Sequence, residues 1–284
     1  MAATETVRLK RIIAKTLRKA KRWYLAYILS QVTILGFAVL SIFWQIDQRL
    51  SAVAAFVAVL ATECLRWRSD FWKSQGEFAK RRWELIDGFA VSVSDGWVAD
   101  WLAARPSNFL ADVTENELKG SDFDSLAIPG PRRLLDNIEE SAWWSKHESR
   151  IVAWYLGLIL VVILAGAFAA LTITITGIGA AIDASESRIT QNVGAMICAV
   201  LAFVFSINLV RLLVSFISFF HSAKAILGRC RALLDSGNVD ERSALLLLFD
   251  YQTSRDAAPL LPTLVWKVHG QHLRREWDRF RSRS

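Results

Sequence analysis

"IVAWYLGLILVVILAGAFAALTITITGIGAAI", residues 151–182, is the longest uncharged stretch of this chain. As a helix it would be about 48 Å long at 1.5 Å per residue, which exceeds the roughly 30 Å hydrocarbon core of a bilayer. Residues 189–210 form a second uncharged stretch after a short connector. The two stretches predict two consecutive membrane-spanning helices that form a hairpin.

A first hairpin is predicted nearer the N-terminus. Residues 23–45 contain no Asp, Glu, Lys, Arg or His and are long enough to span a membrane. Residues 50–62 are also uncharged but end at Glu63, and a stretch this short also fits a re-entrant or buried helix. The connector "IDQRL" is so short that the second helix must return antiparallel to the first. The sequence therefore predicts an all-α membrane protein with four transmembrane helices in two antiparallel hairpins.

Positive charge predicts the orientation of these helices. Eight Lys or Arg residues lie in "VRLKRIIAKTLRKAKRW", residues 7–23, and residues 65–83 are again basic. The only Lys or Arg residues in the two hairpin connectors are Arg49 and Arg188. Because positive residues collect on the cytoplasmic side, both termini and the middle segment are expected in the cytoplasm. The net charge of +7 is then explained by basic residues that face anionic lipid, and we expect no binding to DNA or RNA polymers.

The alternation of charged and apolar stretches divides the chain into five segments. These are a basic N-terminal segment 1–22, a first hairpin 23–64, a cytosolic insert 65–150, a second hairpin 151–221 and C-terminal helices 222–284. The cytosolic portion is predicted to be all-helical. Residues 132–155 have a helical pattern that runs without a break into the third span. Residues 102–133 are rich in Pro, Gly, Asp and Asn and predict a loop with one short helical turn.

The C-terminal segment predicts three helical stretches. The first continues the fourth span and ends at Gly237, and the second begins with Asp240 as its N-cap and ends at Pro259. On the last helix the residues near one face are Leu264, Val268, His272 and Trp277.

No catalytic or cofactor motif is present in the sequence. His269 and His272 are three residues apart, but no third metal ligand follows at a suitable spacing. Cys64, Cys198 and Cys230 are far apart and predict reduced packing residues. We therefore expect no enzyme activity, no metal and no cofactor.

Three cytosolic stretches resemble a known family. They are "EFAKRRWELIDGFAVSV" at residues 77–93, "AIPGPRRLLDNIEESAWWSKHESR" at 127–150 and "LFDYQTSRDAAPLLPTLVWKVHGQHLRREWD" at 248–278. The third carries Asp250, Arg255, Pro259, Pro262, Trp266 and Glu276. In content and order these stretches resemble the four-transmembrane effectors associated with cyclic-oligonucleotide synthases in bacterial antiphage (CBASS) operons.

The resemblance implies an antiviral effector in the inner membrane. A cyclic oligonucleotide made on infection would bind the cytosolic helices, and the protein would oligomerise or rearrange to permeabilise the membrane. Candidate phosphate contacts are Arg81, Arg82, Arg132, Arg133, Arg255 and Lys267. Trp143 and Trp144 are candidates for stacking on bases. Alternatively, these basic residues face lipid headgroups or pair with acids, and the tryptophans are interfacial anchors or core residues.

A polar stripe follows the fourth span. Asn208, Arg211, Ser215 and Ser218 recur three or four residues apart, so they share one helix face within apolar sequence. We expect them to line a pore at the cytosolic mouth or to form an interface edge. The alternative to a pore-forming effector is a membrane-anchored scaffold or partner-binding protein whose spans only hold it in place.

Overall fold

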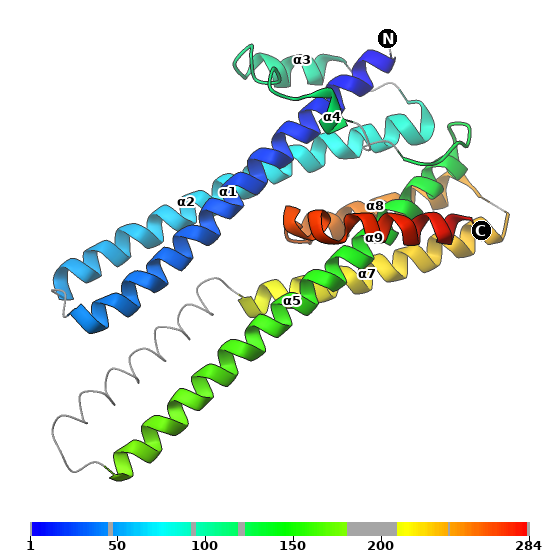
Figure 1. Cartoon of the computed structure of the whole chain (residues 1–284). Coiled ribbons are helices and arrows are strands. Elements are labelled where there is room, and N and C mark those ends of the chain that lie inside the picture. Colours follow the sequence, from blue (N-terminus) through cyan, green and yellow to red (C-terminus); the bar gives the residue numbers. More distant parts are fainter. Residues whose placement is uncertain are drawn as a thin grey trace. The chain divides into compact units, whose positions relative to one another are not determined.

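The computed structural model describes residues 2–44, 48–91, 95–118, 123–180, 209–237 and 239–282, and its secondary structure there is entirely helical. This confirms the predicted all-α fold class for these residues. The helices are α1 (Ala2–Trp44), α2 (Gln48–Phe89), α3 (Asp95–Ala103), α4 (Glu115–Leu118), α5 (Pro131–Ala180), α7 (Leu209–Asp235), α8 (Glu241–Ala257) and α9 (Thr263–Arg281) (Figure 1).

The chain forms two compact units. The first, which we call the helical unit, comprises Met1–Arg22, Ser69–Val152 and Ser215–Ser284. The second, the apolar unit, comprises Trp23–Arg68 and Ala153–Val214. Helices α1, α2, α5 and α7 each contribute residues to both units.

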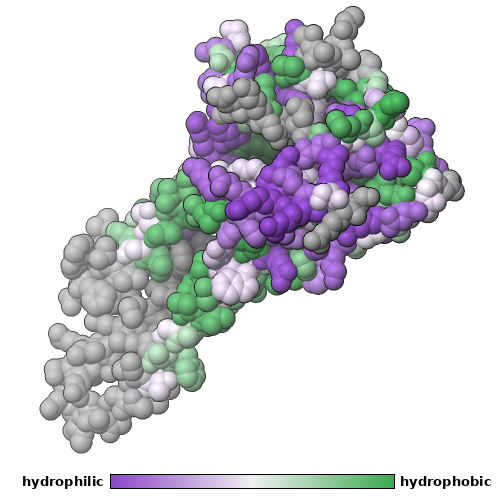
Figure 2. Space-filling model, turned by 45° about the vertical axis from the view of Figure 1, so that its right-hand side comes forward, coloured by the Kyte–Doolittle hydropathy of each residue, from purple (hydrophilic) through white to green (hydrophobic). Residues whose placement is uncertain are grey.

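The apolar unit exposes large hydrophobic side chains on its described helices. In this unit α1 and α2 lie side by side and antiparallel (Figure 1). Phe56 on α2 is 65% exposed and Phe168 on α5 is 72% exposed. Figure 2 shows hydrophobic residues along the described part of this unit. Such a surface is unfavourable in water and is typical of a lipid-facing one.

Two helices are long and apolar enough to cross a membrane by length and composition. Within the described residues they are Pro131–Ala169 in α5 and Leu209–Asp235, which is α7. The uncharged part of α5 begins at Ile151. The predicted first two spans are helical within α1 and α2, but residues 45–47 lie outside the described residues. Most of the predicted fourth span also lies outside them, so the four-span topology stays a prediction.

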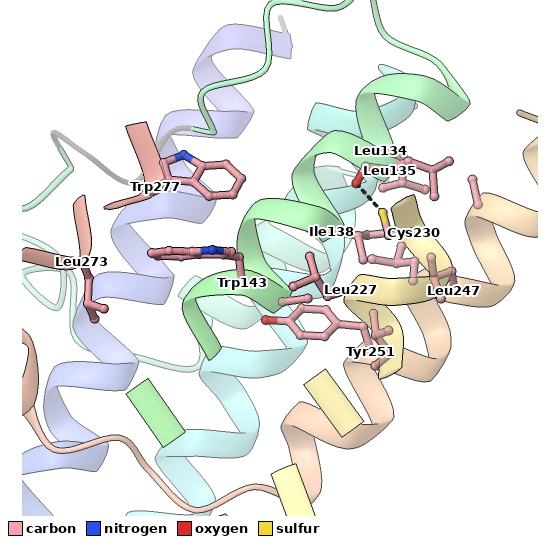
Figure 3. Packing of buried hydrophobic residues seen from close by; sticks show 14 residues of the cluster. Leu134, Leu135, Ile138, Trp143, Leu227, Cys230, Leu247, Tyr251, Leu273 and Trp277 are labelled. Carbon is pink, nitrogen blue, oxygen red and sulfur yellow. Dashed lines mark hydrogen bonds between the residues drawn. The ribbon is translucent and has the colours of Figure 1, made fainter. Parts of the chain in front are cut away.

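The first of two hydrophobic cores in the helical unit lies between α5, α7, α8 and α9. Figure 3 shows this cluster, with Trp143 from α5 and Trp277 from α9 close together. Their ring centroids are 5.3 Å apart. Cys230 is buried in the cluster as a free thiol and donates a hydrogen bond to the carbonyl oxygen of Leu135 at 3.0 Å. Burial raises the pKa of this thiol, so Cys230 is a packing residue, as predicted.

A second core lies between α1, α2 and α3. It contains Leu9, Ile12, Ala79, Trp83, Ile86, Val98, Trp101 and Phe109. Helices α1 and α2 approach closely at Gly76, where an added Cβ would lie 2.8 Å from Cδ2 of Leu17 and 2.9 Å from Oγ1 of Thr16. Glycine at position 76 therefore permits this approach.

Replacing Gly76 with alanine is expected to destabilise the helical unit by about 1–2 kcal/mol, because the overlap with Leu17 and Thr16 outweighs the helix propensity of alanine. Gly228 on α7 is the matched control, since an added Cβ there meets no atom within 4 Å. The thermal unfolding midpoint of the full chain in detergent should fall for Gly76→Ala and stay equal or rise for Gly228→Ala. Equal rises for both variants would contradict the close approach.

Candidate ligand-binding cavity

The helical unit contains a cavity of about 460 Å³. Most of its lining comes from α1, α2, α5, α8 and α9 and from Pro259–Leu261 between α8 and α9, and Leu118, Phe123 and Phe219 complete it. This volume is within the range of small-molecule and cofactor sites. The lining combines lysines and arginines with acids and aromatic rings.

Helices α1 and α2 supply four lysines to the cavity. Lys10 and Lys21 lie on α1, and Lys73 and Lys80 lie on α2 two turns apart on one face. The ammonium group of Lys73 donates hydrogen bonds to the carbonyl oxygens of Asp256, at 2.7 Å, and of Ala258. Lys73 is therefore already held by the C-terminal end of α8.

The surroundings of Lys21 and Lys80 differ from those of Lys73. Within the described ranges, neither ammonium group makes a hydrogen bond or has a carboxylate oxygen within 4 Å. Burial lowers the pKa of both lysines, and the Arg255 charge lowers that of Lys80 further, whereas nearby glutamates oppose the shifts. Two partly desolvated cations with no direct partner would be stabilised by an anionic ligand.

Arg255 forms a buried ion network at one wall of the cavity. Its side chain is 7% exposed, and its Nε donates to Glu77 at 2.6 Å. Its Nη2 donates to Glu84 at 3.2 Å, and Nη1 pairs with the other oxygen of Glu84. Gln252 donates to Glu84 at 2.9 Å. Burial opposes ionisation of Glu84, but the Arg255 and Lys80 charges and these hydrogen bonds lower its pKa overall.

Helix α5 contributes two acids and a tryptophan to the cavity. Glu140, Trp144 and Glu148 are four residues apart, so they share one face of the helix. Glu140 accepts a hydrogen bond from the backbone N–H of Asp124 at 2.9 Å, and burial raises its pKa. Burial raises the pKa of Glu148 to about 7, while the Lys21 and Lys80 charges oppose the rise.

Aromatic rings complete the lining. The rings of Trp144 and Trp266 have centroids 5.1 Å apart and are tilted by 53°. Tyr251 shares a hydrogen bond of 2.9 Å with Ser145, and its hydroxyl also contacts the carbonyl oxygen of Ser141. Trp266 is 53% exposed, so one of its surfaces is accessible. Such rings can stack on a flat heterocycle.

Of the ligand contacts predicted from sequence, the structure brings only Arg255 and Trp144 to the cavity. Arg81 pairs with Asp256, and Arg133 pairs with Asp87 at 3.0 Å. Arg132 and Lys267 are exposed and do not line the cavity.

Two further candidates are packed elsewhere. Arg82 lies over the ring of Trp97, at 4.0 Å from its centroid, and burial lowers the pKa of its guanidinium. Trp143 is 5% exposed in the core (Figure 3). Stacking of Trp143 on a base is therefore corrected to a packing role, because its ring packs in the core against Trp144, His147 and Trp277.

The predicted pore-lining residues are described only in part. Asn208 lies outside the described residues. On α7, Arg211 and Ser218 are exposed and Ser215 is half-buried. Among the residues that the structure describes, no three His, Cys, Asp or Glu side chains are grouped so that they could hold a metal ion.

Sequence reasoning missed Lys21, Lys80, Glu148 and the cavity itself. A signal was present, since Lys10, Ala14, Leu17 and Lys21 share one face of a basic helix, as do Lys73, Glu77 and Lys80. This spacing shows which residues share a face, but not which faces meet.

The Glu148 pKa predicts a pH dependence of stability. The folded chain keeps this carboxyl protonated up to about pH 7, whereas the unfolded chain releases the proton near pH 4.5. Between these values the folded state binds more protons, so the free energy of unfolding falls as pH rises, by up to about 3 kcal/mol. The Glu148→Gln variant has no carboxyl that titrates at this position, so its free energy of unfolding should not show this fall.

The thermal midpoint of Glu148→Gln minus that of the wild type should therefore grow from pH 5 to pH 8. A difference that is constant over this range would contradict the raised pKa.

Over the described residues the chain is all-helical, with two long apolar helices and a basic, aromatic-lined cavity. No protein-family model, curated protein sequence or solved structure matches the chain.

Proposed function

We propose that this chain is a four-span inner-membrane effector of bacterial antiphage defence that binds a cyclic oligonucleotide in the cavity and then permeabilises the membrane. One observation supports the part of this proposal that concerns ligand binding. Lys21 and Lys80, without direct partners in the described ranges, line the same cavity as Trp144 and Trp266. Cations bind phosphodiesters and aromatic rings stack on bases, so the lining suits both parts of a nucleotide.

The membrane half rests on the apolar helices. We place spans at residues 23–45, 50–62, 151–182 and 189–210, with both termini in the cytoplasm. The exposed hydrophobic side chains of α1, α2 and α5 support lipid contact. The positive-inside distribution supports the orientation.

Chain continuity offers a route from ligand to membrane. The cavity is lined by α1, α2 and α5, and each of these helices also supplies residues to the apolar unit. A ligand shifts the protein between two states only if it binds one of them more tightly. A ligand that draws Lys21 and Lys80 together would favour one packing of α1 against α2. Oligomerisation would then place the polar stripe of Asn208, Arg211, Ser215 and Ser218 along a shared path.

The test of ligand binding uses the full chain in lipid nanodiscs. Cyclic di-AMP, cyclic di-GMP, cyclic GMP–AMP and cyclic tri-AMP are titrated by calorimetry at two salt concentrations. At least one should bind with a Kd of about 10 µM or lower, and more weakly at high salt. Absence of binding by every member at about 1 mM would contradict the proposal.

A further inference from the structure

Apart from Glu77 on α2, which Arg255 binds, the charged side chains that α1, α2 and α5 supply to the cavity are segregated by helix. Helices α1 and α2 supply Lys10, Lys21, Lys73 and Lys80, whereas α5 supplies Glu140 and Glu148 with Trp144 between them. A ligand that fills the cavity therefore needs negative charge toward α1 and α2 and hydrogen-bond donors toward α5. A simple polyanion does not meet the second requirement.

The acidic side chains that line the cavity differ in whether they have a hydrogen-bond or ion-pair partner. Glu77 is bound by Arg255, and one oxygen of Glu140 accepts from the Asp124 backbone. Glu148 makes no hydrogen bond and has no cation within 4 Å among the residues that the structure describes. The charged groups that act on it are Lys21 from α1 and Lys80 from α2, while Arg255 from α8 is occupied by Glu77 and Glu84.

From this arrangement we infer that the ligand carries guanine, which stacks on Trp144 and donates its N1–H and 2-amino N–H to the carboxylate of Glu148. The inference rests on the proposed function and specifies the base that the cavity recognises. Trp144 lies one helical turn from Glu148 on the same face of α5, so a base on the tryptophan presents its edge to that carboxylate. The phosphates of the ligand bind Lys21 and Lys80.

Guanine is the base that fits a carboxylate acceptor best. Its Watson–Crick edge carries two adjacent donors, which match the two oxygens of an ionised carboxylate. Adenine and cytosine offer one amino group beside a ring acceptor, and uracil offers one N–H between two carbonyls. A ring acceptor or carbonyl placed against a carboxylate oxygen is repulsive.

The test compares cyclic di-GMP with cyclic di-IMP, which lacks only the 2-amino groups, and with cyclic di-UMP. Calorimetry on the full chain in nanodiscs at pH 8, where Glu148 is ionised, should give about tenfold or more tighter binding of cyclic di-GMP than of either analogue. The preference should fall at pH 6, because Glu148 is then protonated and one of its oxygens becomes a donor. This comparison of the two pH values tests the role of Glu148 in the wild-type chain, without a variant.

The Glu148→Gln variant should bind cyclic di-GMP and cyclic di-IMP within about threefold of each other, because an amide offers only one acceptor atom. Glu241→Gln, at an exposed position at the start of α8, is the control and should keep the wild-type preference. Equal wild-type affinities for cyclic di-GMP and cyclic di-IMP at both pH values overturn the guanine assignment but leave the proposed function standing. Absence of binding by any cyclic nucleotide overturns both.

Discussion

Replacing Arg255 with methionine is expected to lower the free energy of unfolding by about 3–5 kcal/mol. The guanidinium is bonded to both Glu77 and Glu84, and all three side chains are buried. Methionine fills a similar volume but leaves the two carboxylates without their hydrogen-bonded guanidinium partner. Removal of one partner from a buried ion network costs far more than the intact network contributes, because the remaining charges stay desolvated.

An exposed ion pair provides the matched control. Arg229 contacts Asp250 at 2.6 Å, but the two side chains are 58% and 53% exposed. Arg229→Met should therefore change stability by less than about 1 kcal/mol. The thermal midpoints of both variants are measured by circular dichroism of the full chain in detergent. Adding Glu77→Gln and Glu84→Gln to Arg255→Met should recover part of the loss, and similar midpoints for Arg255→Met and Arg229→Met would contradict a buried network.

Replacing both Lys21 and Lys80 with methionine is expected to weaken binding of the tightest cyclic nucleotide by about a hundredfold or more. Each ammonium group would lose a charge-assisted hydrogen bond to phosphate in a partly desolvated cavity. Stability should change by less than about 1 kcal/mol. Neither lysine has a direct partner in the described ranges and burial disfavours its charge, while Lys80 gives the ionised Glu84 a through-space contribution that is secondary to that of Arg255. Calorimetric titration of the full chain in nanodiscs measures the affinity.

Lys224 is the control for this pair. It is exposed on α7 and does not line the cavity, so Lys224→Met should leave the affinity within about twofold of the wild type. If the double variant binds as tightly as Lys224→Met, the cavity is not the site of phosphate binding.

Local signals predicted several helices correctly. The uninterrupted helical pattern from residue 132 predicted that α5 continues into the apolar stretch, and the helix runs over Pro131–Ala180. Asp240 was predicted as an N-cap, and its carboxylate accepts from the backbone N–H of Ser243 at 2.9 Å. Gly237 has a φ of +68°, which fits its predicted place at the end of α7. Each of these features depends on neighbours along the chain.

The sequence did not predict which face of α9 is buried. Leu264 is 69% exposed and Val268 is also exposed, whereas Val265, Gly270, Leu273 and Trp277 are buried. Apolar residues occupy both faces of the first turns of this helix, so the sequence alone did not show which face packs on α5. Contact between Trp277 and Trp143 decides the orientation in the structure.

The candidate site was predicted poorly for a related reason. The cavity depends on side chains that are far apart in sequence, such as Lys21, Lys80 and Glu148, and on which helix faces meet. The arginines were predicted as phosphate contacts from their residue type and from their positions in the three stretches that resemble the known family. Arg81 and Arg133 instead pair with Asp256 and Asp87, acids that lie far along the chain. Sequence pattern gives the composition of each face but not these long-range pairs.

Ligand-dependent leakage separates an effector from a membrane-anchored scaffold most directly. The full chain is reconstituted in vesicles of bacterial lipids that enclose a self-quenched, membrane-impermeant dye, and the tightest-binding cyclic nucleotide is added. We expect dye release with the ligand, little release without it, and none above that background from the Lys21→Met/Lys80→Met variant. Intact vesicles at a ligand concentration that saturates the cavity would contradict a permeabilising function.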